Sequence, residues 1–242
     1  MTGNLFSRSD DDGSPMSTTK PAPLPAQRFR DFITDRGFPC VGAKSALGKD
    51  QLTHLVLDDM RTGLEDQTLL RAFYRFVDRY RADRTLFTSF AVSWRGPVGL
   101  SEEAFEDLLW ERLGALHRLD EAEHDWDERV DADPDSPHFS FSLRGEAFFV
   151  VGLHDGASRQ ARRFAYPTLV FNLHDQFETL RAQGRYEKLH ETIMQRDAAL
   201  QGEPNPMLAQ HGEAPPARQY SGRKVEEDWQ CPFRPEGEAG HA

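Results

Sequence analysis

Two strand-like segments, separated by Arg144 and Gly145, constrain the fold more than any other feature of the sequence. The segment 138–143, "HFSFSL", alternates between polar and apolar residues, and the segment 146–154, "EAFFVVGLH", is apolar over most of its length. A short connection that contains glycine is typical of a β-hairpin, in which the two strands are antiparallel. We therefore expect an antiparallel sheet that includes this hairpin.

The hydrophobic periodicity elsewhere predicts three more strands and a set of helices. The strands are expected at 52–57, 85–94 and 167–173, and the helices at 25–36, at 64–82, after a Ser101 cap, after an Asp175 cap, and at 186–200. Because these strands do not alternate regularly with helices, a doubly wound parallel sheet is not expected. The predicted fold class is α+β, a single domain with a largely antiparallel sheet of about five strands packed with helices.

Composition places this domain between two polar tails. Residues 1–23 and 234–242 are predicted to be disordered, which leaves 24–233 as the folded domain. The net charge of −11 argues against nucleic acid as a partner. No apolar stretch approaches the roughly 18 to 20 residues that span a membrane, and the N-terminus lacks the apolar core of a secretory signal. We expect a cytoplasmic protein with no membrane partner; a homodimer is one state that the sequence leaves open.

The sequence has none of the common cofactor or nucleophile motifs. We find no G-x-G-x-x-G after a strand, no Walker A loop, no H-E-x-x-H and no G-x-S-x-G. The two cysteines, Cys40 and Cys231, are far apart and form no C-x-x-C pair, so free thiols are expected. Any activity must therefore come from a less common set of residues.

Histidines at strand ends form the first candidate group. His138 begins a predicted strand, and His154 and His174 end two others. His154 is followed by small residues and then by three arginines, which suit carboxylate or phosphate. An imidazole beside an anion-binding cluster would suit haem, with iron on the histidine and propionates on the arginines. The alternatives are structural histidines and a solvated basic turn. These arginines are Arg159, Arg162 and Arg163.

Thiols and a C-terminal segment give further candidates. Cys40 precedes a probable helix, whose N-terminus favours thiolate, and Cys231 has aromatic neighbours in "DWQCPF". Either is a haem thiolate candidate or a small buried hydrophobic residue. The segment "RQYSGR" either closes a pocket over a ligand or fastens the C-terminal segment to the domain; its candidate cofactor-binding residues are Arg218, Tyr220 and Arg223. For the axial ligand we rank His154 first, then His138, then Cys40, followed by Cys231 and His174.

Several segments together resemble the YqcI/YcgG family over most of residues 28–233. They are "FPCVGAKSAL", "HFSFSLRGEAFFVVGLH", "ASRQARRF", "PTLVFNLHDQFETLR", "RQYSGR" and "WQCPF". The resemblance implies haem-dependent N-hydroxylation of the guanidino group of a free amino acid such as arginine or enduracididine. It implies haem b, dioxygen and an electron donor as partners. One departure is Asp155, where the family pattern leads us to expect proline.

The resulting functional hypothesis is a haem-dependent monooxygenase acting on arginine or a related guanidino amino acid. Carboxylates near the predicted strand ends would hold the guanidinium; these are Glu146, Asp155, Asp175 and Glu178. No residue is assigned a catalytic step. The alternatives are a haem-binding sensor or carrier without turnover, and an interaction protein without a cofactor.

Overall fold

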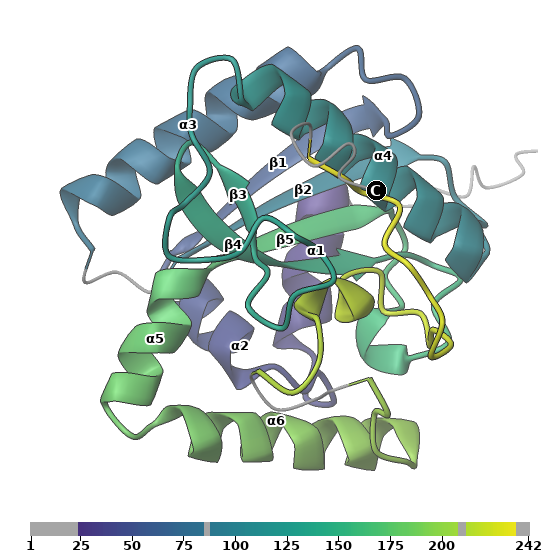
Figure 1. The fold of residues 1–242 in the computed structure, drawn as a ribbon. Coiled ribbons are helices and arrows are strands. Elements are labelled where there is room, and N and C mark those ends of the chain that lie inside the picture. Colours follow the sequence, from purple (N-terminus) through teal and green to yellow (C-terminus); the bar gives the residue numbers. More distant parts are fainter. Residues whose placement is uncertain (1–23, 85–87, 208–211, 236–242) are drawn as a thin grey trace, which may run out of the picture.

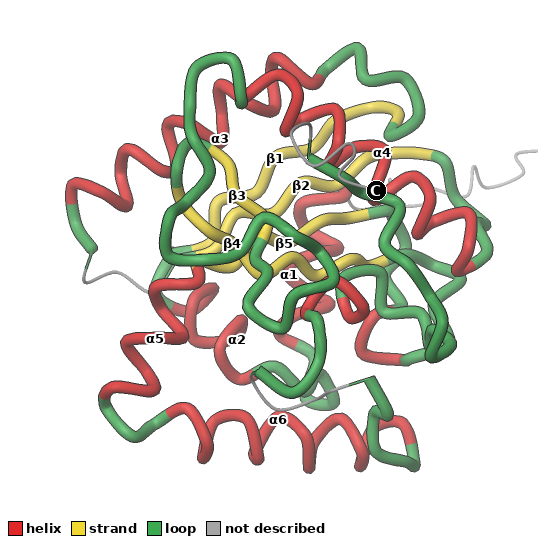
Figure 2. Tube along the Cα trace, viewed as in Figure 1, coloured by secondary structure: helices red, strands yellow, loops and turns green. Residues whose placement is uncertain are grey.

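A five-stranded sheet forms the centre of the protein. The computed structural model describes residues 24–84, 88–207 and 212–235. The strands are β1 (Leu52–Asp59), β2 (Ser89–Gly96), β3 (Phe141–Leu143), β4 (Glu146–Leu153) and β5 (Thr168–Leu173). Their order in the sheet is β1-β2-β5-β4-β3, and only the β1-β2 pair is parallel among the described strands. The predicted α+β class with a largely antiparallel sheet is confirmed (Figure 2).

The helices lie on both faces of this sheet. They are α1 (Pro25–Thr34), α2 (Val41–Gly48), α3 (Asp66–Ala82), α4 (Glu102–Asp120), α5 (His174–Ala182) and α6 (Tyr186–Gln201). Figure 1 shows α3 and α4 on one side of the sheet, with α1, α2 and α6 on the other. Helix α6 contacts α2, α5 and the short 3₁₀ helix Gln160–Arg162.

The predicted hairpin is confirmed and has the expected turn. Arg144 and Gly145 both have positive φ, at 54° and 65°, as a two-residue hairpin turn of the type I′ class requires. The strands pair so that Phe141 lies opposite Phe148. Gly145 supplies the positive φ without strain, and Arg144 is held by its own contacts, including a backbone N–H donated to Asp120 Oδ2 at 2.8 Å.

Alternation along the strands divides the interior into two cores. In β4, Phe148 and Val150 belong to a large core beneath α3 and α4, whereas Val151 and Leu153 face a smaller core beneath α1 and α2. Successive side chains of a strand point to opposite faces, so each face of the sheet is buried by a different pair of helices. The face beneath α1 and α2 carries the candidate site, because the smaller core leaves a cavity there.

The predicted caps of α4 and α5 have different outcomes. Ser101 caps α4 as predicted, and its Oγ accepts from the Ala104 N–H at 3.2 Å. The predicted cap of α5 is wrong: the helix begins two residues earlier, Leu173 is at the cap position, and Asp175 lies in the first turn. Its carboxylate instead receives hydrogen bonds from neighbouring elements. The predicted disordered tail 1–23 lies outside the described residues. The predicted tail 234–242 also lies outside them, except for residues 234 and 235. None of the helices in the described ranges could cross a membrane.

Candidate functional site

A partly open pocket, which we name cavity A, lies where the smaller core is incomplete. Its volume is about 210 Å³. The floor is formed by β4 and β5, and the walls by α1, α2, the 3₁₀ helix and α6. Most of its surface is apolar, because aliphatic and aromatic side chains supply most of the lining. The polar or ionisable members of this lining are Cys40, Ser89, Arg162, Asn172, Asp197 and Asn205.

Cys40 places a thiol on the wall of cavity A. It is the N-cap of α2, and its Sγ accepts from the Ala43 N–H at 3.4 Å. Burial raises the pKa of the Cys40 thiol, while the Ala43 and Gly42 N–H groups and the charge of Arg162 act in the opposite direction. The local sequence explains this position, because Pro39 cannot continue a helix from the preceding turn and α2 starts directly after Cys40.

Arg162 places a cation on the same wall. It comes from the end of the 3₁₀ helix and donates from Nη1 to the Gly152 carbonyl at 3.0 Å and to the Tyr220 carbonyl at 3.3 Å. Its Nη2 donates to the Gln219 carbonyl at 3.2 Å. Burial lowers the pKa of Arg162 to about 10, which leaves the guanidinium charged at neutral pH. The cavity therefore contains one fixed positive charge near its thiol.

Asp197 is the only carboxylate among the described residues that line cavity A. It lies on α6, is 5% exposed, and accepts from Arg159 through Oδ2. Arg159 also donates to the Glu203 carbonyl at 3.2 Å. This ion pair attaches α6 to the loop before the 3₁₀ helix, and it leaves the Asp197 Oδ1 atom available to a ligand N–H.

A second cavity, which we name cavity B, adjoins the first. Its volume is about 190 Å³, and the two cavities share Phe149 and Ile193 in their linings. Each alone is smaller than the roughly 300–1,000 Å³ typical of small-molecule sites. The ionisable residues that line cavity B are His138, His174, Arg181, Tyr186 and His190. Two of the three predicted strand-end histidines, His138 and His174, therefore come together.

The third of those histidines, His154, is in a different place. It is 1% exposed, and its ring stacks on Phe105 of α4 with centroids 4.3 Å apart. Its imidazole donates to the Leu100 carbonyl, and Nδ1 has no hydrogen-bond partner among the described residues. His154 lines neither cavity A nor cavity B. Geometry thus separates the first-ranked ligand candidate from Cys40.

The three arginines that follow His154 do not converge on one anion. Arg162 faces cavity A, and Arg159 is paired with Asp197. Arg163 donates from Nε to the Ala157 carbonyl at 2.9 Å and from Nη2 to the Ser158 carbonyl at 3.2 Å. All three therefore hold the chain's own backbone or carboxylate groups, and Arg162, which also bonds the Gly152, Tyr220 and Gln219 carbonyls, is the one that lines cavity A.

The C-terminal candidates pack over the large core. Cys231 is 3% exposed, and burial raises the pKa of its thiol to about 12. The Tyr220 hydroxyl donates to the Phe148 carbonyl at 3.1 Å and accepts from the Phe141 N–H at 3.2 Å. Arg223 pairs with buried Glu106, at 2.8 Å between Nη2 and Oε2. Of the two readings of "RQYSGR", these contacts favour attachment of the segment to the domain.

Arg218 fits the same pattern. Its guanidinium donates to backbone carbonyls of the following loop, at 3.3 Å to Glu227 and 3.4 Å to Trp229, and also to the Glu226 carbonyl. It lies over the Trp229 ring, with Cζ 5.8 Å from the centroid, inside the limit of about 6 Å for a cation–π contact. These bonds hold the loop before Cys231.

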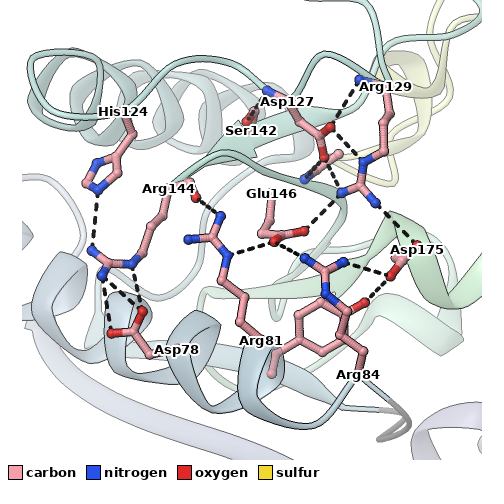
Figure 3. A network of polar contacts seen from close by, with 12 residues as sticks. Asp78, Arg81, Arg84, His124, Asp127, Arg129, Ser142, Arg144, Glu146 and Asp175 are labelled. Carbon is pink, nitrogen blue, oxygen red and sulfur yellow. Dashed lines mark hydrogen bonds and ion pairs between the residues drawn. The ribbon is translucent and has the colours of Figure 1, made fainter.

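Two of the four predicted guanidinium-binding acids lie in a network of the chain's own charges, drawn in Figure 3. Glu146 is 2% exposed and accepts from Arg81 at 2.8 Å, Arg84 at 3.2 Å and Arg129 at 2.9 Å. Asp175 accepts from Arg84 at 3.4 Å and Arg129 at 3.3 Å. Arginine side chains of the protein thus occupy the place that a substrate guanidinium would need at Glu146.

The other two predicted acids have separate contacts. Asp155, at the position where proline was expected, accepts from the Gly99 N–H through Oδ2 at 2.7 Å and so holds the loop before α4. Glu178 is about half exposed and is paired with His174, at 3.2 Å, and with Arg181. Neither is among the residues that line cavity A or cavity B.

Sequence reasoning did not identify Asp197, Asn172 or Arg181. Asn172 interrupts an apolar strand, and its polar side chain accepts from Ser89 Oγ at 2.8 Å on the floor of cavity A. That interruption was a usable signal, because polar residues inside buried strands need partners. Asp197 and Arg181 lie on helices with polar outer faces, where nothing in the periodicity distinguishes them.

Within the described ranges, no three His, Cys, Asp or Glu side chains come close enough together to hold a metal ion. Cavity A instead offers one thiol in an apolar setting. The class of protein that the fold and this site define is an α+β domain with a mostly apolar cavity whose lining includes one thiol and one buried arginine.

This chain belongs to the YqcI/YcgG family, whose model matches residues 29–234. It is similar to the Bacillus subtilis (strain 168) protein named Uncharacterized protein YcgG, with 31% identity over 141 residues, 55% of this chain and 54% of that protein. It is also 28% identical over 148 residues to Uncharacterized protein YqcI of the same organism, covering 59% and 57% of the two chains. The chain thus spans little more than half the length of these relatives. No solved structure matches it.

Proposed function

We propose that the protein is a haem-dependent monooxygenase that N-hydroxylates the guanidino group of a free amino acid, arginine or a related compound. The observation that carries the proposal is the thiol of Cys40 on the wall of an apolar cavity, beside a buried cation. The family supports it only through the resemblance described above. Cys40 replaces His154 as the proposed iron ligand, because His154 lines neither cavity.

Three features of the lining of cavity A suit a haem group, but a porphyrin is larger than the roughly 210 Å³ of the cavity as it stands, so haem binding would require the cavity to widen. A thiol at a helix N-terminus loses its proton on binding a metal and is then stabilised by the Ala43 N–H and the helix dipole. Apolar walls supplied by Phe29, Val151 and Leu153 suit a porphyrin. Arg162 offers a positive charge to a propionate or to the thiolate. When bound, haem would supply activation of dioxygen, which thiolate ligation favours.

The remaining residues would position the substrate. Asp197 is the carboxylate on cavity A, and its Oδ1 atom would accept from the guanidinium. Asn172 and Ser89 would orient a second polar group on the sheet side. Helix α6 and the aromatic walls would exclude bulk water, which strengthens each of these polar contacts. The result is a guanidino nitrogen held in the same enclosed space as the thiol.

The direct test is to express the protein with haem supplied and to measure bound haem and turnover. We expect a Soret band in the purified protein and, with arginine, reductant and dioxygen, a hydroxyguanidine product detected by mass spectrometry. Haem binding without product from arginine or related guanidino amino acids would favour a sensor or carrier. A colourless protein would contradict the proposal as a whole.

The matched variants are Asp197→Asn and Asp135→Asn. Asp197 lines the cavity, whereas Asp135 is an exposed carboxylate paired with Arg234 on the surface. We expect Asp197→Asn to raise the KM for arginine by about tenfold or more, since one charge-assisted hydrogen bond contributes about 1.5–3 kcal/mol. Asp135→Asn should leave KM unchanged. Equal effects of the two substitutions would remove Asp197 from the substrate site.

A further inference from the structure

Cavity B has a lining rich in basic side chains that the proposed function does not yet use. Its ionisable lining consists of three histidines, Arg181 and Tyr186, and none of the described residues that line it is a carboxylate. The basic members come from the loop before β3 and from α5 and α6. Such a lining is complementary to an anion, while Phe139, Phe149 and Phe177 supply apolar walls for the body of an organic molecule.

Arg181 has an unused donor in this place. Its Nε atom is buried and has no hydrogen-bond partner among the described residues. Its Nη1 donates to Glu178, and the guanidinium lies over the Tyr186 ring, with Cζ 4.4 Å from the centroid. A buried donor without an acceptor is costly, which points to a missing acceptor. Because Glu178 uses only Nη1, the edge formed by Nε and Nη2 remains for the two-pronged contact that arginine makes with carboxylate.

The contacts of Glu178 show that these bases can hold a carboxylate. Its Oε1 is 3.2 Å from His174 Nε2 and also accepts from Arg181. The Glu178 side chain is 47% exposed, so it can leave this position at little cost in buried area. A ligand carboxylate would meet Arg181 from the cavity side, because both ring nitrogens of His174 already have partners, Glu178 at Nε2 and Ser140 Oγ at Nδ1, each at 3.2 Å.

Cavity B also lies at a suitable place relative to cavity A. The two share Phe149 and Ile193, so these side chains form the boundary between them. A ligand that displaced this boundary would meet Asp197 at one end and Arg181 at the other. Opposite charges at the two ends of the combined space match a guanidino amino acid, whose guanidinium and carboxylate are separated by an aliphatic chain.

We infer that cavity B is the carboxylate subsite, with Arg181 as the residue that binds the carboxylate and His174 beside it. The existence of a carboxylate site stands on the lining of cavity B, and its assignment to the substrate rests on the proposed function. The site should then select amino acids over the corresponding amines, because an amine lacks the carboxylate that Arg181 would bind.

The experiment compares arginine with agmatine, which is arginine without its carboxylate, by isothermal titration calorimetry. Both ligands are titrated into the full chain, with and without bound haem. We expect Arg181→Gln to raise the Kd for arginine by about tenfold or more and to leave the Kd for agmatine unchanged. Arg185→Gln is the matched control, because Arg185 is exposed and lines neither cavity. Arg181→Lys, which keeps the charge but not the two-pronged geometry, should lie between wild type and Arg181→Gln.

Glu178→Gln should change the Kd for arginine in the direction opposite to Arg181→Gln. Removing the charge of Glu178 frees Arg181 Nη1 and should tighten arginine binding severalfold without affecting agmatine. If Glu178 instead holds the substrate guanidinium, the same substitution weakens both ligands, and the inference is overturned. It is also overturned if the wild-type protein binds neither ligand, if Arg181→Gln leaves arginine binding unchanged, or if it weakens both ligands equally. A protein that takes up no haem but still prefers arginine to agmatine through Arg181 would contradict the proposed function and support this subsite.

Discussion

The ring of His154 stacks on the ring of Phe105, with centroids 4.3 Å apart and planes 14° apart. The pair lies on the α4 side of the sheet, in contact with the large core, whereas Cys40 lines cavity A on the side of α1 and α2. His154 is therefore placed as a core residue. This relationship decides which of the candidate ligands the proposed function uses.

A first prediction concerns the contribution of His154 to stability. His154→Ala should lower the free energy of unfolding by about 2–4 kcal/mol, because it leaves a cavity beside Phe105. His154→Phe keeps the stacked ring and should cost no more than about 1.5 kcal/mol. Urea denaturation followed by circular dichroism measures both. Equal losses in the two variants would show that stacking is not what His154 contributes.

A second prediction concerns pH. Burial lowers the pKa of His54 to about 4, and burial also lowers the pKa of His154. Because the folded state favours the neutral imidazoles, their stability is fully present above about pH 6.5 and is lost as pH falls toward the folded pKa. We expect His54 to account for about 2–3 kcal/mol of the loss between pH 6.5 and 4. Unfolding free energies of wild type and His54→Gln across this range test it; parallel pH profiles would contradict it.

A third prediction concerns the close approach of the backbone after His154. A Cβ at Gly156 would lie 2.1 Å from the Leu100 carbonyl oxygen, which belongs to the backbone and cannot turn away. Gly156→Ala should therefore destabilise the protein by at least about 2 kcal/mol. Gly48→Ala is the control, because nothing lies within 4 Å of its added Cβ. Thermal melts should show a large shift for the first variant and little or none for the second.

A fourth prediction concerns the network of Figure 3. Glu146→Gln removes the buried charge that three arginines share and should cost about 2–4 kcal/mol of unfolding free energy. The exposed pair of Asp135 and Arg234, at 3.1 Å, is the comparison, and Asp135→Asn should change stability by less than about 1 kcal/mol. A small effect of Glu146→Gln would contradict this, because it would mean that water solvates the three arginines as favourably as the Glu146 carboxylate does.

The fold could be predicted further than the site could. The hairpin at Arg144 and Gly145 and the cap at Ser101 follow from local rules, and both are confirmed. The position of β5 between β2 and β4 could not be predicted, because pairing between distant strands leaves no mark in a single sequence. The cap of α5 was misassigned because Asp175 has a partner from a distant segment, the Tyr80 hydroxyl.

For the site, the sequence contained a signal that was not used. In β4, residues two apart share a face, so His154 follows Phe148, Val150 and Gly152 on the large-core side. Alternation alone thus places His154 away from Val151 and Leu153. Which face carries a cavity could not be predicted, since that depends on how α2 and α6 pack.

The most direct test of the central claim is the ferrous-CO spectrum of Cys40→Ser, compared with Cys231→Ser and His154→Phe. If the Cys40 thiolate binds the haem iron, the wild-type protein shows the long-wavelength Soret band of a thiolate-ligated haem. That band should disappear in Cys40→Ser and persist in the other two variants. A wild-type-like band in Cys40→Ser, or its loss in His154→Phe while Cys40→Ser retains it, would contradict the account.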